Sequence, residues 1–176
     1  MLNKTITIFL VALFSCAAVA QNRTIKKADK EISKFYKITN FVKDEIVISE
    51  SSNTQTPANF NEGSFFKILE NERFLGYGYL GSAAGKAAKF DYLVLFDDQF
   101  IITKTKVLIY REEYGGEIGS KRWLKQFEGK ASSSEELIYN QDIIPISGAT
   151  VSVQAMTKAI NDLLKSINIL QDLKEI

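Results

Sequence analysis

A short string of small and hydroxyl residues near the end of the chain, Ser147-Gly148-Ala149-Thr150, stands where an apolar run meets a helical pattern. Ser147 or Thr150 could cap that helix by accepting a hydrogen bond from a free N–H group of its first turn. The same N–H groups and the positive end of the helix dipole could instead bind a phosphate, and Gly148 would let the backbone approach it closely. The string alone leaves both interpretations open.

A second group of candidate residues lies in the sequence REEYGGEIGS. Adjacent glutamates such as Glu112 and Glu113 are usually solvated charges, because an acid-base residue needs an environment that tunes its pKa. Gly115, Gly116 and Gly119 could line a ligand or simply permit turns. No catalytic side chain is therefore predicted.

The composition also limits the chemistry, because the chain contains no histidine and a single cysteine, Cys16. Without histidine, the commonest general base and the usual zinc and haem ligands are missing. No metal site is predicted. Redox chemistry in such a chain would have to come from a cofactor.

The first twenty residues have the pattern of a secretory signal peptide, with an apolar run after Lys4 that ends in Ala18-Val19-Ala20. A membrane anchor is one alternative, but the run is shorter than the roughly 20 residues of a typical span. Lipidation at Cys16 is another. We expect a signal peptide over residues 1–20 and a mature protein over residues 21–176, at the periplasmic or another extracytoplasmic face of a bacterial membrane.

The overall composition, 45% hydrophobic and 24% charged, is that of one ordinary globular domain. The formal net charge is +1. A chain so close to neutral overall indicates neither nucleic acid nor an anionic membrane as a partner.

The hydrophobic pattern predicts an α+β fold, a mostly antiparallel sheet of about five strands with helices packed on it, one domain and one core. Apolar residues at helical spacing predict helices, and β-branched and aromatic runs separated by polar tips predict hairpins. The expected elements are a helix over 25–36, a strand over 44–50, a surface loop over 51–63, hairpins over 64–81 and 89–110 joined by a loop over 82–88, a short helix over 121–130 and a long helix over 151–173.

The order of three segments resembles the FMN-binding domain family, whose members include the covalently flavinylated subunits of the Rnf electron-transport complex and of the sodium-translocating NADH:quinone oxidoreductase. The segments are a hairpin followed by EEYGGEIGS, then WLKQFEGK, then SGAT at the start of a helix. The resemblance extends from Phe65 to Leu170. The chain departs from the family pattern in two places. The family usually has aspartate three residues before the serine, where this chain has Ile144, and it often has Thr-Pro where this chain has Tyr114-Gly115.

The resemblance implies one FMN, joined to Thr150 by a phosphoester bond, with its phosphate at the N-terminus of the last helix. Ser147, Gly148 and Ala149 would adjoin the phosphate. The preceding loop would face the isoalloxazine ring. The cofactor-binding residues that the resemblance implies in this loop are Glu113, Gly115, Gly116 and Gly119.

We interpret the chain as an exported flavoprotein that is an electron carrier rather than a catalyst with its own substrate. Membrane redox proteins would be its electron donor or acceptor, and a flavin-attaching enzyme would load it. One alternative is an FMN-dependent reductase with Tyr77, Tyr79 or Tyr114 as proton donor. The other is a non-flavinylated interaction or sensor module of the same fold.

Overall fold

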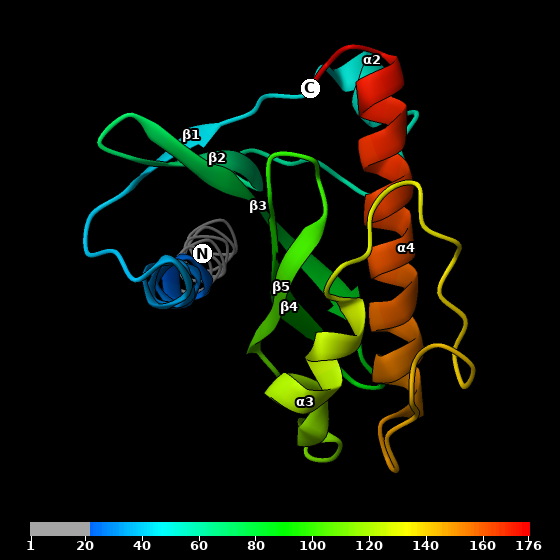
Figure 1. Cartoon of the computed structure of the whole chain (residues 1–176). Helices are drawn as coiled ribbons and strands as arrows, with labels where there is room; N and C mark the ends of the chain where they lie inside the picture. The colour runs from blue at the N-terminus through cyan, green and yellow to red at the C-terminus, as the bar shows by residue number, and fades with distance from the viewer. Residues whose placement is uncertain (1–21) are drawn as a thin grey trace, which may run out of the picture.

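The centre of the fold is a five-stranded antiparallel sheet in a computed structural model that describes residues 22–176 (Figure 1). The predicted signal peptide, residues 1–20, lies outside the described residues. Strands that follow one another in the chain also pair in the sheet, in the order β1-β2-β3-β4-β5. The strands are β1 (Val42–Glu45), β2 (Phe65–Glu70), β3 (Arg73–Ala84), β4 (Lys89–Phe96) and β5 (Ile102–Ile109). The α+β class and both predicted hairpins are confirmed.

Helices cover both faces of this sheet. The N-terminal helix, described over residues 22–36, lies on one side, and the long helix α4 (Thr150–Asp172) lies on the other (Figure 1). The predictions of these two helices are confirmed. The shorter helical elements are α2 (Glu50–Asn53), α3 (Lys121–Leu124) and two 3-10 turns, η1 (Gly116–Gly119) and η2 (Lys125–Phe127).

The apolar side chains form two hydrophobic clusters, one on each face of the sheet, so the predicted single core is wrong. Strand β4 shows why, because its side chains alternate between the faces. Leu93 and Leu95 pack with Ala28 and Ile32 of the N-terminal helix. Val94 and its neighbours on the other face pack against α4. The sheet is therefore the middle of three layers.

The turn between β2 and β3 has the geometry that a two-residue hairpin requires. Asn71 and Glu72 both adopt positive φ, 48° and 66°. Two successive residues with positive φ match the twist of antiparallel strands, and asparagine tolerates this conformation well. The predicted polar tip, ENE, is confirmed as this turn.

The segment between β1 and β2 differs from its prediction. The strand expected over 44–50 ends at Glu45, because Ser49 accepts a hydrogen bond from the Ser52 N–H (3.3 Å) and thereby caps α2. The surface loop expected over 51–63 is partly buried, with Ala58 and Phe60 in the cluster beneath α4. Strand β3 also runs further than expected, through three residues of the predicted 82–88 loop.

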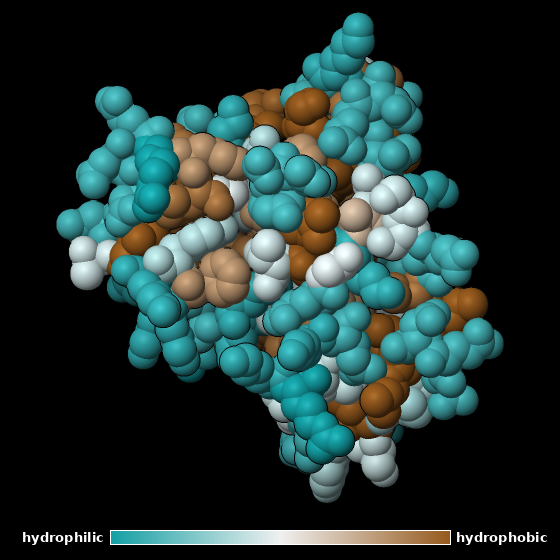
Figure 2. Space-filling model, viewed as in Figure 1, coloured by the Kyte–Doolittle hydropathy of each residue, from teal (hydrophilic) through white to brown (hydrophobic). Residues whose placement is uncertain are grey.

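Helix α4 buries the face that its periodicity predicts. Met156, Ile160, Leu163, Ile167 and Leu170 are each 0% exposed. Polar residues lie between them, and hydrophilic residues make up most of the outline of the molecule in Figure 2. Within residues 22–176, no helix is long and apolar enough to cross a membrane.

The buried tyrosine Tyr79, on β3, predicts a loss of stability in alkali. Burial raises its pKa to about 12. Because the unfolded value is about 10, this contribution to stability is complete below about pH 10 and is lost as the pH rises towards 12. We expect the urea midpoint of the wild type to fall over that range, and to fall less steeply for Tyr79→Phe. An equally steep fall in the variant would show that Tyr79 is not a source of it.

Candidate functional site

The start of α4 has no side-chain cap. Its N-cap residue is Ala149, which cannot accept a hydrogen bond through its side chain, and the structure shows no side-chain cap there. The possibility that Ser147 or Thr150 caps the helix is therefore wrong. Both of these residues are exposed. The first N–H groups of α4 thus keep their capacity to bind an anion.

The backbone just before this helix depends on glycine. Gly148 has φ +76°, in the left-handed region that other residues rarely adopt. Space alone does not require glycine, since an added Cβ atom would lie 3.8 Å from its nearest neighbour, the Tyr114 Cβ. The glycine therefore sets the path by which the chain enters α4.

A pocket of about 450 Å³ lies at this helix start. Its volume falls within the range of small-molecule sites. Three chain segments line it: the β3–β4 turn, the segment that follows β5, and the first turn of α4. The lining residues are Lys86, Tyr110, Glu112, Tyr114, Gly148, Ala149, Thr150, Val151 and Ser152.

The glycine-rich loop packs directly against the helix start. Gly115 has φ +76°, and a Cβ atom added there would overlap the Cβ of Ala149. The Tyr110 hydroxyl donates to the Tyr114 carbonyl oxygen at 3.1 Å and lies 3.1 Å from Ser152 Oγ. The two segments that the sequence analysis singled out therefore meet in space.

Helix α3 fixes the chain that leads into this site. The Trp123 indole N–H donates to the Ile144 carbonyl oxygen at 2.8 Å, and Gln126 Oε1 accepts from the Ile144 N–H at 2.8 Å. The helix predicted over 121–130 is divided into α3 and the 3-10 turn η2 and ends at Phe127. Its predicted apolar face is confirmed, because Trp123, Leu124 and Phe127 are buried in the cluster beneath α4. The Ile144 side chain itself is 64% exposed.

Comparison with protein families decides what this arrangement is: residues 85–165 match the FMN-binding domain family. This segment is an FMN-binding domain. Its cofactor is FMN. The comparison with curated proteins found no match. The match runs from the β3–β4 turn into α4, and so includes all three segments that line the pocket.

The residues of the FMN-binding domain suit the cofactor. The uncapped start of α4 offers N–H donors for the phosphate, and Lys86 on the facing turn adds a positive charge at the pocket. Tyr114, 74% exposed, presents an aromatic ring at the same pocket. An aromatic ring can pack against the flat ring system of a flavin.

The predicted cofactor-binding residues of the FMN-binding domain divide into two groups. Gly148, Ala149 and Thr150 line the pocket, Gly115 contacts Ala149, and Ser147 is the next residue along the chain. The others do not line it. Glu113 is exposed, and the two glycines of η1, Gly116 and Gly119, would meet no atom within 4 Å of an added Cβ.

Five residues of the pocket were not predicted as site residues from the sequence: Lys86, Tyr110, Glu112, Val151 and Ser152. Glu112 accepts hydrogen bonds from the N–H groups of Ala88 (3.0 Å) and Ala87 (2.8 Å), and these bonds lower its pKa. Glu112 therefore holds the β3–β4 turn against the segment that follows β5. Its lowered pKa makes it a poor proton donor. One feature of the sequence could have pointed to Lys86 as a site residue: it is the only charged residue in a loop of small residues, SAAGKAA.

The close contact at Gly115 predicts a specific sensitivity. Gly115→Ala should lower the free energy of unfolding by about 1–3 kcal/mol, because the residue would hold a left-handed backbone and its Cβ would overlap Ala149. Gly116→Ala is the matched control, because no atom lies within 4 Å of its added Cβ. Urea unfolding measures both. Equal effects of the two substitutions would contradict the packing of the loop on α4.

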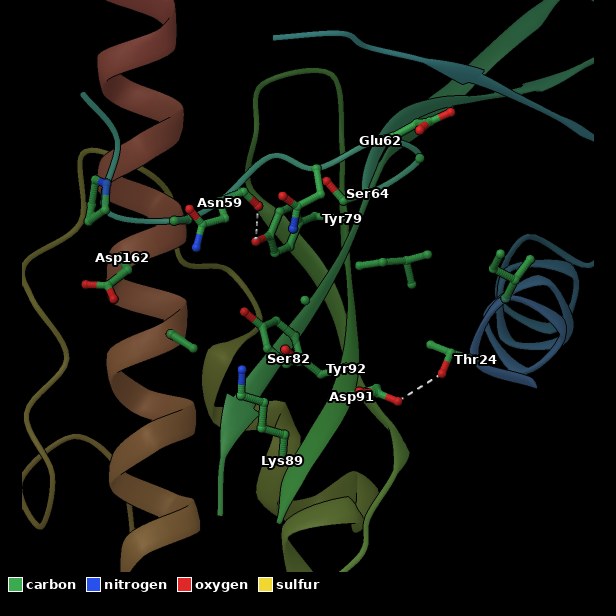
Figure 3. Close-up of a pocket in the computed structure, with 18 of the residues that line it drawn as sticks. Thr24, Asn59, Glu62, Ser64, Tyr79, Ser82, Lys89, Asp91, Tyr92 and Asp162 are labelled. Carbon is green, nitrogen blue, oxygen red and sulfur yellow. Dashed lines mark hydrogen bonds between the residues drawn. The ribbon is translucent and has the colours of Figure 1, made fainter. Parts of the chain in front are cut away.

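A larger cavity, of about 660 Å³, lies elsewhere on the chain, and none of the predicted cofactor-binding residues lines it (Figure 3). Tyr79 is on its wall, but its hydroxyl already donates to the Asn59 carbonyl oxygen at 2.9 Å. Tyr77 stacks on Phe100 with ring centroids 4.3 Å apart. Of the three tyrosines considered as proton donors, only Tyr114 adjoins the pocket at α4.

Proposed function

We propose that this chain is an exported flavoprotein that carries electrons through one FMN, joined by a phosphoester bond to the hydroxyl of Thr150. One observation carries the proposal. Thr150 is the exposed first residue of a helix whose N–H groups have no side-chain cap, at a pocket of the FMN-binding domain.

The residues around Thr150 support this attachment. N–H groups at the start of α4 and the helix dipole would stabilise the negative charge of a phosphate. Gly148, with its left-handed backbone, leaves no side chain between the phosphate and the helix start. Lys86 would supply a cation, and Tyr114 an aromatic surface.

The chain's own residues favour an electron carrier over an enzyme with its own substrate. FMN supplies reversible electron uptake when bound. The sequence has no histidine, and its one cysteine lies in the proposed signal peptide. The hydroxyls of Tyr110 and Tyr79 are both engaged in hydrogen bonds to backbone carbonyl oxygens. These hydrogen bonds position neighbouring loops, so the two hydroxyls are not free to relay protons to a substrate.

Export and covalent attachment support each other in this proposal. The apolar run that ends in Ala18-Val19-Ala20 would direct the chain to the extracytoplasmic face of a membrane. A cofactor that dissociates there would be diluted, whereas a tethered one keeps a high effective concentration. Membrane redox proteins would then donate and accept the electrons, after a flavin-attaching enzyme has acted.

A specific observation favours one alternative, a non-flavinylated interaction or sensor module. Ile144 stands three residues before Ser147, where flavinylated relatives usually have aspartate, and its exposed side chain is accessible to an attaching enzyme. An enzyme that recognises this aspartate would not attach flavin to this chain.

Coexpression with a flavin-attaching enzyme tests the proposal. After denaturing electrophoresis, we expect the band of this chain to fluoresce, because only a covalent flavin survives denaturation. A dark band would support the non-flavinylated module. The loaded protein should exchange electrons with a redox partner but show no steady-state turnover of small-molecule acceptors, and such turnover would instead support an FMN-dependent reductase.

A further inference from the structure

The outer side of the N-terminal helix carries a row of positive charges. Counted along the helix, these cations recur every three or four residues, which places them on one face. All are exposed. We call this set the basic face: Arg23, Lys26, Lys30 and Lys34.

The packing of the helix fixes where the basic face points. Ala28 and Ile32 lie on the opposite side of the helix and are each 0% exposed, packed on Phe66 and Leu95 of the sheet. The side chains of the basic face therefore point away from the sheet, whereas the neighbouring Lys27 ammonium turns back to it and donates to the Leu108 carbonyl oxygen of β5 at 2.9 Å. Figure 1 shows this helix at the flank of the molecule, separated from α4 by the sheet.

Acidic residues do not neutralise the basic face. The described helix contains two, Asp29 and Glu31, and both are only partly exposed. Asp29 Oδ1 is already paired with Lys43 Nζ at 2.7 Å, outside the helix. Residues 22–36 contain five basic and two acidic residues, whereas the whole chain is nearly neutral, with 22 basic and 21 acidic residues.

We propose that the basic face binds the surface of an anionic phospholipid membrane. Clusters of four to eight lysines and arginines on a helix beside an apolar segment are suited to anionic lipid. In the sequence, the apolar run that ends at Ala20 adjoins this helix. Lysine stems let the ammonium groups reach headgroups without insertion of the helix.

The shape of the basic face favours a membrane over a folded partner. From Arg23 to Lys34 the cations extend along about 17 Å of one helix side, given a rise of about 1.5 Å per residue. A straight row of flexible cations fits a planar array of negative headgroups. This inference goes beyond the proposed electron transfer and does not require FMN, so it can fail while that proposal stands.

Vesicle flotation tests the inference, with a chain that begins at Gln21 so that the apolar run cannot insert. This chain keeps every described element and both hydrophobic clusters. We expect it to float with vesicles of phosphatidylglycerol and phosphatidylcholine at low salt, to float much less at high salt, and not to float with phosphatidylcholine alone. Lys26→Gln/Lys30→Gln/Lys34→Gln should weaken binding by about 100-fold.

The control variant neutralises exposed lysines outside the basic face, Lys67→Gln/Lys165→Gln/Lys174→Gln. It removes the same charge and should bind vesicles as the wild type does. Circular dichroism confirms that both variants fold. Failure of the wild type to float, or equal weakening by the two variants, would overturn the inference. So would binding to duplex DNA without binding to vesicles, because the basic face would then serve a nucleic acid.

Discussion

Thr150→Ala protein, coexpressed with a flavin-attaching enzyme, should give a dark band where the wild type fluoresces after denaturation. The methyl side chain has no oxygen that could form the phosphoester. The fold should persist, because Thr150 is exposed and caps nothing in the structure. Circular dichroism and urea unfolding would show the domain intact.

Substitutions at neighbouring residues distinguish the role of the Thr150 hydroxyl, as the attachment atom, from the role of the residues around it. Ser147→Ala should reduce loading only partly, and Gly148→Val should impair it, because valine rarely adopts the φ of +76° found there. Covalent flavin on Thr150→Ala would place the bond elsewhere. If the wild type stays dark, Ile144→Asp becomes decisive: its exposed position tolerates aspartate, and a gain of flavin would show that only the modification signal is missing.

Leu163→Ala should lower the free energy of unfolding by about 2–5 kcal/mol. Leu163 is 0% exposed in the larger cluster, so its truncation removes apolar contacts and leaves a cavity between α4 and the sheet. Chemical denaturation measures the change. Lys165→Ala, two residues along on the exposed side of α4, is the control and should stay within about 0.5 kcal/mol. A small effect of Leu163→Ala would mean that α4 packs by another face.

The long helices and the hairpins could be predicted from the sequence because their signals are local. Apolar residues in α4 recur at helical spacing, and the two strands of each hairpin flank a polar tip. The second hydrophobic cluster was missed although a signal existed. Tyr92 to Phe96 is an unbroken apolar run, which is typical of a strand buried on both faces.

The candidate site was predictable only in part. Gly148 and Thr150 belong to one short string, so their proximity follows from the chain itself. Lys86 and Tyr110 reach the pocket through the pairing of β3, β4 and β5, which single residues do not reveal. The choice of Glu113 over Glu112 shows the same limit, because adjacent residues in an extended segment point to opposite sides.

The agreement between strand order and chain order bears on how the protein folds. Each strand pairs with the strand that precedes it, and the connections from β2 to β5 are short turns, so most of the sheet can form from local contacts, which favours rapid assembly. Helix α4 comes last in the chain, and until it docks, one apolar face of the sheet remains open to water. Thr150 reaches the loop of Tyr110 and Gly115 only in that final step. Flavin loading at Thr150, as proposed, would therefore select chains that have completed folding.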